Sequence, residues 1–253
     1  MPNADFAGRT ALVIGATSGI GRATALAFAQ AGADVVAAGL GDDQGREVEA
    51  AIKAIGVDAL FVPADVTREA DVQAVMERAE ARFGRIHAAV NNAGVECAYG
   101  PVQDRSAEEF DRIIAVNLRG IFFGLRHQIP HMLRHGGGAI VNTASQAGLT
   151  GLANVAIYTA SKHGVVGLTK SASLEVAASN IRINAVAPGP VDTGLLHRMV
   201  DGKVPLEAIA KDVPMGRIAQ PEEIAEAIVW LCSDGASYVT GHTLAIDGGF
   251  TVP

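Results

Sequence analysis

Short apolar runs alternate with longer segments of helical periodicity along the whole of this 253-residue sequence. Such alternation is typical of β-strand, α-helix, β-strand units, in which parallel strands lie buried beneath helices. Strands are predicted at residues 10–15, 34–38, 58–62, 86–91, 138–143, 181–186 and 242–246. Helices are predicted to begin near Gly19, Asp42, Glu69, Ala107, Asn154 and Pro221. The sequence therefore predicts an α/β fold with a parallel sheet.

The composition and the absence of linkers indicate one domain over residues 1–253. Apolar residues make up 49% of the chain and aromatic residues only 5%, which suits strands buried on both faces. No linker rich in Pro, Gly or Ser and no repeat divides the chain. Residues 190–217 depart from the alternation, because short helical pieces are interrupted at Pro190, Gly194, Gly202, Pro205 and Pro214. So long an irregular loop predicts a substrate-binding lid.

The charge and the cysteines exclude several classes of protein. With a net charge of −7 and scattered Lys and Arg, the chain offers nucleic acid no basic surface. No signal peptide is visible at the start, and no apolar run approaches the ~20 residues that span a bilayer, so we expect a cytoplasmic protein without a membrane partner. Cys97 and Cys232 form no C-x-x-C pattern, which argues against a disulfide framework or a thiolate metal site.

A glycine-rich loop, residues 15–21, follows the first predicted strand and runs directly into a helix. Gly15, Gly19 and Gly21 allow a tight turn and the close approach of a ligand to the backbone. The free N–H groups at the start of the helix suit a pyrophosphate. This position predicts dinucleotide binding, although the spacing is not G-x-G-x-x-G and the loop lacks the Lys-Ser/Thr of an ATP-binding P-loop.

Three polar side chains predict acid/base chemistry. Tyr158 and Lys162 are four residues apart in a helical segment, so they share a helix face. A neighbouring ammonium favours the phenolate, and we expect Lys162 to lower the pKa of Tyr158. Ser145 follows an apolar strand, at the end where parallel sheets gather functional groups. No G-x-S-x-G surrounds any serine, which excludes serine hydrolase chemistry of that kind.

Together these residues resemble the short-chain dehydrogenase/reductase family, in its compact single-domain branch, over almost the whole chain. Residues 15–21 are similar to the family motif T-G-x-x-x-G-x-G, residues 91–94 to N-N-A-G, and residues 188–193 to P-G-x-x-x-T. The resemblance implies a doubly wound (Rossmann) sheet of seven strands with helices on both faces, a homotetramer, and hydride transfer between NAD(P) and a secondary alcohol or ketone.

The resemblance also assigns roles to individual residues. The catalytic set that it implies is Asn117, Ser145, Tyr158 and Lys162, with Asn117 positioning a water behind the lysine. The implied cofactor-binding residues are Gly15, Thr17, Ser18, Gly19, Ile20, Gly21, Leu40, Asp65, Val66, Asn92, Ala93, Gly94, Tyr158, Lys162, Pro188, Gly189, Val191 and Thr193. Tyr158 would exchange a proton with the substrate oxygen, which Ser145 would polarise.

The sequence departs from the family pattern at two places. Ile14 stands where most members have threonine, and we expect a slight structural adjustment there. After the second strand, Gly39-Leu40-Gly41 replaces the acidic residue that usually selects NAD. Asp42 and Asp43 follow and would repel the 2′-phosphate of NADP, while Arg46 would point toward solvent or an acidic neighbour. NAD is therefore favoured over NADP as the cofactor.

The substrate is predicted less closely than the cofactor. Candidate contacts are Ser145, Tyr158, Gln146, Asn154, Glu96, His197 and Arg198. Their polarity favours a sugar, a sugar acid or another polyol. The alternatives are a 3-oxoacyl thioester on acyl carrier protein, and a regulator that binds cofactor without turnover. An isomerase or lyase of the extended branch would need a further C-terminal domain.

A metal site is not expected. His127, His131 and His135 recur every four residues, a spacing that suits metal ligation from one helix face. However, Pro130 is expected to interrupt that helix, and no carboxylate or cysteine joins the three histidines in the sequence.

Overall fold

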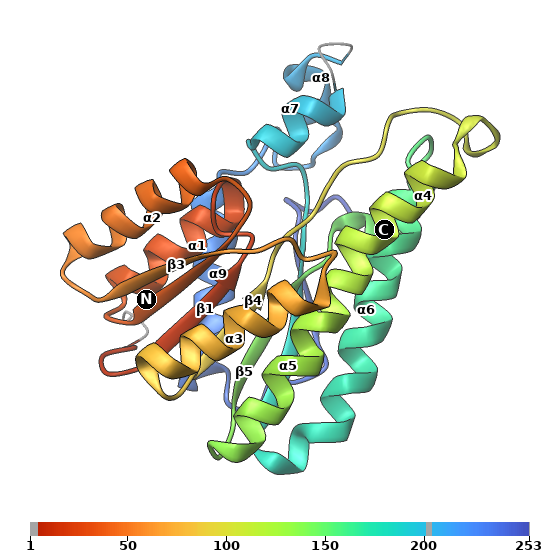
Figure 1. Cartoon of the computed structure of the whole chain (residues 1–253). Helices are drawn as coiled ribbons and strands as arrows, with labels where there is room; N and C mark the ends of the chain where they lie inside the picture. The colour runs from red at the N-terminus through yellow and green to blue at the C-terminus, as the bar shows by residue number, and fades with distance from the viewer. Residues whose placement is uncertain (1–4, 201–203, 253) are drawn as a thin grey trace.

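The computed structural model describes residues 5–200 and 204–252, and this part of the chain forms three layers, with a parallel sheet between two layers of helices (Figure 1). The described residues contain seven strands in the order β3-β2-β1-β4-β5-β6-β7. Their bounds are β1 Thr10–Ile14, β2 Asp34–Gly39, β3 Ala59–Pro63, β4 Ala88–Asn91, β5 Gly138–Thr143, β6 Ile181–Pro188 and β7 Thr243–Ile246. The predicted doubly wound α/β fold is confirmed.

Helices cover both faces of the sheet. One face carries α1 (Gly19–Gln30), α2 (Asp42–Ile55) and α9 (Pro221–Cys232), and the other carries α3 (Glu69–Phe83), α5 (Gly120–Arg134) and α6 (Ala156–Val176). The remaining helical elements are η1 Val102–Asp104, α4 Ala107–Ile114, the π-helical η2 Ala115–Arg119, η3 Gln146–Gly148, η4 Ala177–Ser179, α7 Gly194–Val200, α8 Leu206–Asp212 and η5 Asp234–Ala236. Across the described ranges, no helix combines the length and apolarity needed to cross a bilayer.

Strand β1 shows why the sheet is buried on both sides. Ala11 and Val13 pack into the core beneath α1, α2 and α9, whereas Leu12 and Ile14 pack into the core beneath α3, α5 and α6. Successive side chains of a strand point to opposite faces. A strand buried on both faces therefore needs apolar residues at successive positions. Short apolar runs of this kind predicted the strands in the sequence.

Two helix boundaries differ from the sequence prediction. Helix α6 begins at Ala156 rather than near Asn154, because Asn154 has a left-handed backbone with φ of 66°. Helix α5 continues the helical run that was predicted to begin near Ala107, and the expected interruption at Pro130 is wrong, since the helix contains this proline. The loss of one backbone hydrogen bond is offset by the packing of α5, which buries residues such as Ile121, Leu125 and Met132.

Loops and two short helices gather at the carboxyl edge of the sheet, whereas the amino edge carries a set of polar contacts. At the carboxyl edge, the loops after β1, β4, β5 and β6 converge, and α7 and α8 stand beyond them at the top of Figure 1. Residues 201–203, which include Gly202 of the predicted lid, lie outside the described residues.

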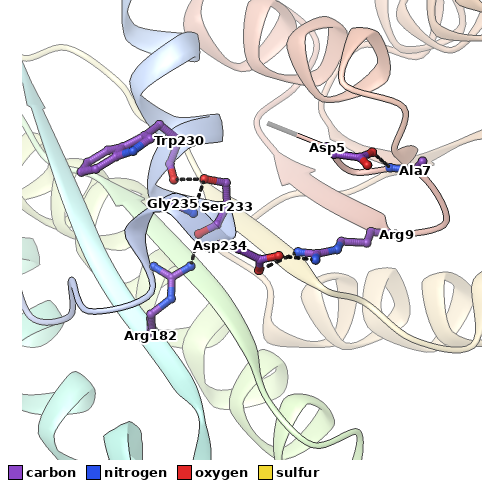
Figure 2. Close-up of polar contacts among 8 residues, drawn as sticks. All are labelled: Asp5, Ala7, Arg9, Arg182, Trp230, Ser233, Asp234 and Gly235. Carbon is purple, nitrogen blue, oxygen red and sulfur yellow. Dashed lines mark hydrogen bonds and ion pairs between the residues drawn. The ribbon is translucent and has the colours of Figure 1, made fainter. Parts of the chain in front are cut away.

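At the amino edge, Figure 2 shows a set of polar contacts around η5. Arg9 forms a bidentate ion pair with Asp234, through Nη1–Oδ1 at 3.0 Å and Nη2–Oδ2 at 2.6 Å. Arg182 donates to the carbonyl oxygens of Leu231, at 2.6 Å, and Ser233, at 3.0 Å. These bonds satisfy carbonyl groups that the end of α9 leaves without helical partners.

Candidate active site

The glycine loop packs tightly against the turn that follows β4. Gly15 has φ of 85°, and a Cβ atom there would lie 2.5 Å from the nitrogen of Ala93. Asn92 donates through Nδ2 to the carbonyl oxygen of Gly15, at 3.1 Å. The carbonyl oxygen of Ile14 accepts from the backbone N–H groups of Asn92 and Ala93, at 2.9 and 3.1 Å. Backbone bonds therefore hold this turn although Ile14 lacks the hydroxyl of the family threonine.

A cavity of about 540 Å³ opens at the carboxyl edge of the sheet, between the glycine loop, the strand ends and α7. All the predicted cofactor-binding residues except Gly21 line it. Gly21 is buried behind the loop, where a side chain would collide with Gly15 and Asn92.

Two features of the cavity suit a dinucleotide. Ser18 makes no side-chain capping bond to α1, so the first N–H groups of this helix face the cavity without a side-chain acceptor. A Cβ atom added to Gly19 would lie 3.1 Å from the methyl group of Thr193. The glycine therefore keeps the cavity open at a point where a side chain would narrow it.

The four predicted catalytic residues converge at one end of this cavity. Tyr158 and Lys162 project from α6, and Ser145 follows β5 and lies near the Tyr158 side chain, whose pKa it lowers. Lys162 donates through Nζ to the carbonyl oxygen of Thr143, at 2.8 Å, and Nζ lies 5.6 Å from the centroid of the Tyr158 ring. Ser145, Tyr158 and Lys162 line the cavity.

Asn117 lies behind the cavity wall, fully buried in the π-helical turn η2. Its Oδ1 accepts from the N–H of Val95 at 2.8 Å, and its Nδ2 donates to the carbonyl oxygen of Val95 at 2.9 Å. The side chain thereby fixes the loop that follows the N-N-A-G turn.

Burial dominates the ionisation of the tyrosine and the lysine. It raises the pKa of Tyr158 to about 12, while the nearby Ser145 opposes this rise. It also lowers the pKa of Lys162 to about 8. The pKa of Tyr158 is therefore raised, not lowered as expected, because the phenol has lost its contact with water.

The substrate end of the cavity is mostly apolar. Its wall beyond Ser145 and Tyr158 is built by Val95, Leu152, Val155, Leu195, Leu196 and Met199. These residues come from the loop after β4, the segment before α6, and α7. The sequence did not predict these residues, because apolar residues in irregular segments carry no periodic signal.

The predicted polar substrate contacts divide into two groups. Ser145, Tyr158, Gln146 and Arg198 line the cavity. Three others do not line it and are engaged within the protein. Asn154 donates to Tyr99 Oη at 3.1 Å, His197 pairs with Asp192 at 2.8 Å, and Glu96 forms a bidentate ion pair with Arg198, with both distances 3.1 Å.

The histidine cluster needs a correction. Glu80 on α3 joins His131 and His135, and one potential ligand atom from each lies within 4.8 Å of the others, so a carboxylate does accompany these histidines. However, His131 Nε2 accepts from the backbone N–H of Ile86 at 2.9 Å. The neutral ring then carries its proton on Nδ1, which lies 3.3 Å from Glu80 Oε2. Its Nε2 is therefore occupied by the backbone, while Nδ1 has no hydrogen-bond partner among the described residues. The bond to the backbone explains His131 as a structural residue between α5 and the sheet.

Hydride transfer is the chemistry that this arrangement supports: a dinucleotide-sized cavity on a doubly wound sheet, with a tyrosine, a serine and a lysine at one end. A sequence model of a family described as enoyl-(acyl carrier protein) reductase matches residues 15–251. The chain belongs to the short-chain dehydrogenase/reductase family, and it is an NAD(P)-dependent oxidoreductase of secondary alcohols and ketones.

Two characterised relatives are similar over nearly their whole length. The chain is 42% identical over 246 residues to cyclohexanol dehydrogenase of Acinetobacter sp. (strain SE19), covering 97% of this chain and 96% of the relative. It is 45% identical over 249 residues to cis-4-hydroxycyclohexanecarboxylate dehydrogenase of Sinomonas cyclohexanicum, covering 97% and 98%.

Solved structures agree in fold and include both forms of the cofactor. A 3-ketoacyl-(acyl-carrier-protein) reductase from Brucella melitensis, in complex with NADH, has a TM-score of 0.92 and 37% identity, covering 98% of this chain and 100% of its own. A putative NAD(P)-dependent gluconate 5-dehydrogenase from Beutenbergia cavernae, with bound NADP, has a TM-score of 0.92 and 40% identity, covering 98% and 99%.

Proposed function

We propose that this protein is a dehydrogenase of alicyclic secondary alcohols that also reduces the corresponding ketones. The apolar wall facing Ser145 and Tyr158 carries this proposal, because a hydrocarbon ring gains from burial there whereas a polyol would lose hydrogen bonds to water. The names of the two characterised relatives support it. The sequence favoured a polyol because of seven candidate polar contacts, but three of them, Asn154, Glu96 and His197, do not line the cavity.

Within this site we assign the proton transfer to Tyr158 and the binding of the substrate oxygen to Ser145. Tyr158 accepts the hydroxyl proton during oxidation and returns it during reduction. A bound nicotinamide supplies the hydride acceptor or donor. Lys162, held by the Thr143 carbonyl oxygen, is placed to orient the ribose and to exchange the proton. Asn117 keeps the adjoining loop in position and completes a relay through water.

Initial rates over a substrate panel test the proposal. The panel contains cyclohexanol and cyclohexanone, sugar acids and polyols, and 3-oxoacyl thioesters. We expect kcat/KM for cyclohexanol to exceed that for every polyol by about tenfold or more, from the transfer free energy of several methylene groups. A higher kcat/KM for any polyol would reject the alicyclic assignment.

Reduction of 3-oxoacyl thioesters is the second candidate function. The description of the matching family and the B. melitensis structure favour it. The same panel separates the two functions, because an acyl-chain reductase would prefer the thioester over cyclohexanone. A regulator without turnover would oxidise and reduce none of the panel.

We further propose that NAD is the preferred cofactor. Leu40 lines the cavity after β2, and its side chain is exposed. Arg46 pairs with Asp42 at 3.6 Å, so the nearby cation is engaged by a carboxylate. A 2′-phosphate would therefore meet Asp42 and Asp43 without a basic partner. A kcat/KM for NADP above that for NAD would contradict this choice, and Leu40→Asp should strengthen the preference for NAD.

The lid, the assembly and the location of the protein are proposals as well. Helices α7 and α8 line the substrate end of the cavity through Leu195, Met199 and Ile209, and we expect residues 194–215 to gain protection from hydrogen exchange when ligands bind. Identical exchange with and without ligands would contradict the lid. A homotetramer is expected from the family, and a cytoplasmic location is expected from the sequence. Exposed Phe110, Phe122 and Leu174 on α4, α5 and α6 support an assembly, which light scattering would measure.

A further inference from the structure

A second cavity, of about 350 Å³, adjoins the substrate end of the active-site cavity. The two cavities share five lining residues, Tyr99, Arg198, Met199, Val200 and Val204. The remaining wall of the second cavity comes from the loop after β4, through Glu96 to Ala98, and from α4, through Glu109 and Arg112. A substituent on a ring held at Ser145 and Tyr158 would therefore extend toward a chamber with charged walls.

Two glutamates and two arginines line this cavity, so their formal charges balance, but their contacts are unequally distributed. Glu96 is matched by its bidentate ion pair with Arg198. Glu109 pairs with Arg105 at 3.6 Å and accepts from the N–H of Ala98 at 2.8 Å. Arg112 makes one bond, from Nη2 to the carbonyl oxygen of Glu96 at 3.1 Å, and no carboxylate of the described residues lies within ion-pair distance of it. Among the described residues, the Arg112 guanidinium therefore has no carboxylate in direct contact, although its charge helps to lower the pKa of the nearby Glu96 carboxyl.

We propose that Arg112 is a specificity-determining residue that binds a carboxylate substituent on the alicyclic substrate. This inference rests on the proposed function and names a narrower class of substrate, the hydroxy- and oxocycloalkane carboxylates. The planar guanidinium presents several donors in a geometry that matches a carboxylate. Its bond to the Glu96 carbonyl oxygen holds it at the cavity wall, so less side-chain freedom is lost on binding.

The test compares a charged substrate with its neutral counterparts. Wild type, Arg112→Gln and Arg112→Lys are assayed with NAD on 4-hydroxycyclohexanecarboxylate, its methyl ester and cyclohexanol. In Arg112→Gln, kcat/KM for the acid should fall about tenfold or more, because a charge-assisted hydrogen bond is lost. The ester and cyclohexanol should change by less than about twofold, and Arg112→Lys should recover part of the loss. Arg78→Gln is the matched control, because Arg78 is an exposed arginine of α3 that lines neither cavity.

A binding measurement makes the result independent of turnover. Cyclohexanecarboxylate has no hydroxyl to oxidise, and calorimetry on the holoenzyme should show about tenfold weaker binding to Arg112→Gln than to wild type. An equal loss for the acid and the ester, or unchanged binding of cyclohexanecarboxylate, would overturn the role of Arg112. If wild type oxidises no cycloalkanol, the proposed function fails, and the calorimetric comparison still decides whether Arg112 binds a carboxylate.

Discussion

The carboxyl and amino edges of the sheet are built by the same strands, yet they use polar groups in opposite ways. At the carboxyl edge, Ser18 leaves the start of α1 without a side-chain cap, and Lys162 has one acceptor among the described residues. At the amino edge, Arg182 and Arg9 are bonded to carbonyl oxygens and a carboxylate (Figure 2). Groups with spare hydrogen-bonding capacity bind ligands, whereas groups that are already paired stabilise the fold. Substitutions at the two edges should therefore separate activity from stability.

The largest expected effect is at the carboxyl edge. Tyr158→Phe should lower kcat by about 100-fold or more, because only the transferable proton is lost while the ring still packs. Cofactor affinity and the thermal midpoint should remain near those of wild type, and Tyr238→Phe, at a fully exposed position, is the control. If the variant keeps more than about a tenth of the rate, Tyr158 is not the acid/base.

The pH dependence of oxidation reports the same pair of residues. The rate should rise with pH through an ionisation that belongs to Tyr158 and Lys162 together, because the tyrosine has its pKa raised to about 12 and the lysine has its pKa lowered to about 8. The rise should approach about tenfold per pH unit below that ionisation. Pre-steady-state rates that stay constant from pH 6 to about 10, with chemistry limiting, would contradict this assignment.

At the amino edge, Arg182→Met should reduce stability and spare activity. The change leaves the carbonyl oxygens of Leu231 and Ser233 without their donors. The free energy of unfolding should fall by about 2–4 kcal/mol, the cost of two unsatisfied acceptors. Urea denaturation would measure this loss, while kcat/KM under native conditions should remain unchanged. A normal unfolding midpoint with impaired turnover would show that the amino edge supports activity and not stability, which would contradict the comparison between the edges.

Acid should weaken the amino edge through His87. Its Nδ1 accepts from the backbone N–H of Thr10 at 2.9 Å, and its pKa is lowered to about 4, chiefly by burial. Between pH 6.5, the ordinary pKa, and about 4, the unfolded chain binds this proton more readily than the folded chain, so stability falls as the pH falls through this window. His87→Gln keeps an acceptor but does not titrate, and it should flatten the dependence. An unchanged slope would exclude His87 as a contributor.

The smallest expected effect is that of the Arg9–Asp234 ion pair. The Arg9 side chain is 34% exposed and that of Asp234 is 81% exposed, so solvent screens their attraction. A double-mutant cycle with Arg9→Gln and Asp234→Asn should give a coupling of about 1 kcal/mol or less, which declines with added salt. A coupling above about 2 kcal/mol would show that this pair is shielded from solvent far more than its exposure indicates.

The sequence predicted those parts of the molecule that depend on local pattern. The strands, the glycine loop and the i, i+4 pair of Tyr158 and Lys162 each follow from neighbouring residues, and the structure brings them together as expected. The substrate wall was not predicted, because Val95 and Leu195 meet only through the folded chain. Burial is equally non-local, which is why the direction of the Tyr158 pKa shift was wrong. The interruption expected at Pro130 was wrong because the packing of α5 outweighs the helix-breaking tendency of the proline.

Strand β1 lies between β2 and β4, and this position governs the order in which β1 can pair with its two neighbours as the chain folds. Ala11 lies opposite Val35 in one ladder and opposite Ala88 in the other. The second pairing closes a loop more than three times as long as the first, and its entropy must be overcome before the contacts form. A chain emerging from the ribosome therefore exposes one open edge of β1 until β4 has been synthesised. Until then that edge is available to other chains, so early synthesis is the stage at which this fold is most prone to misassembly.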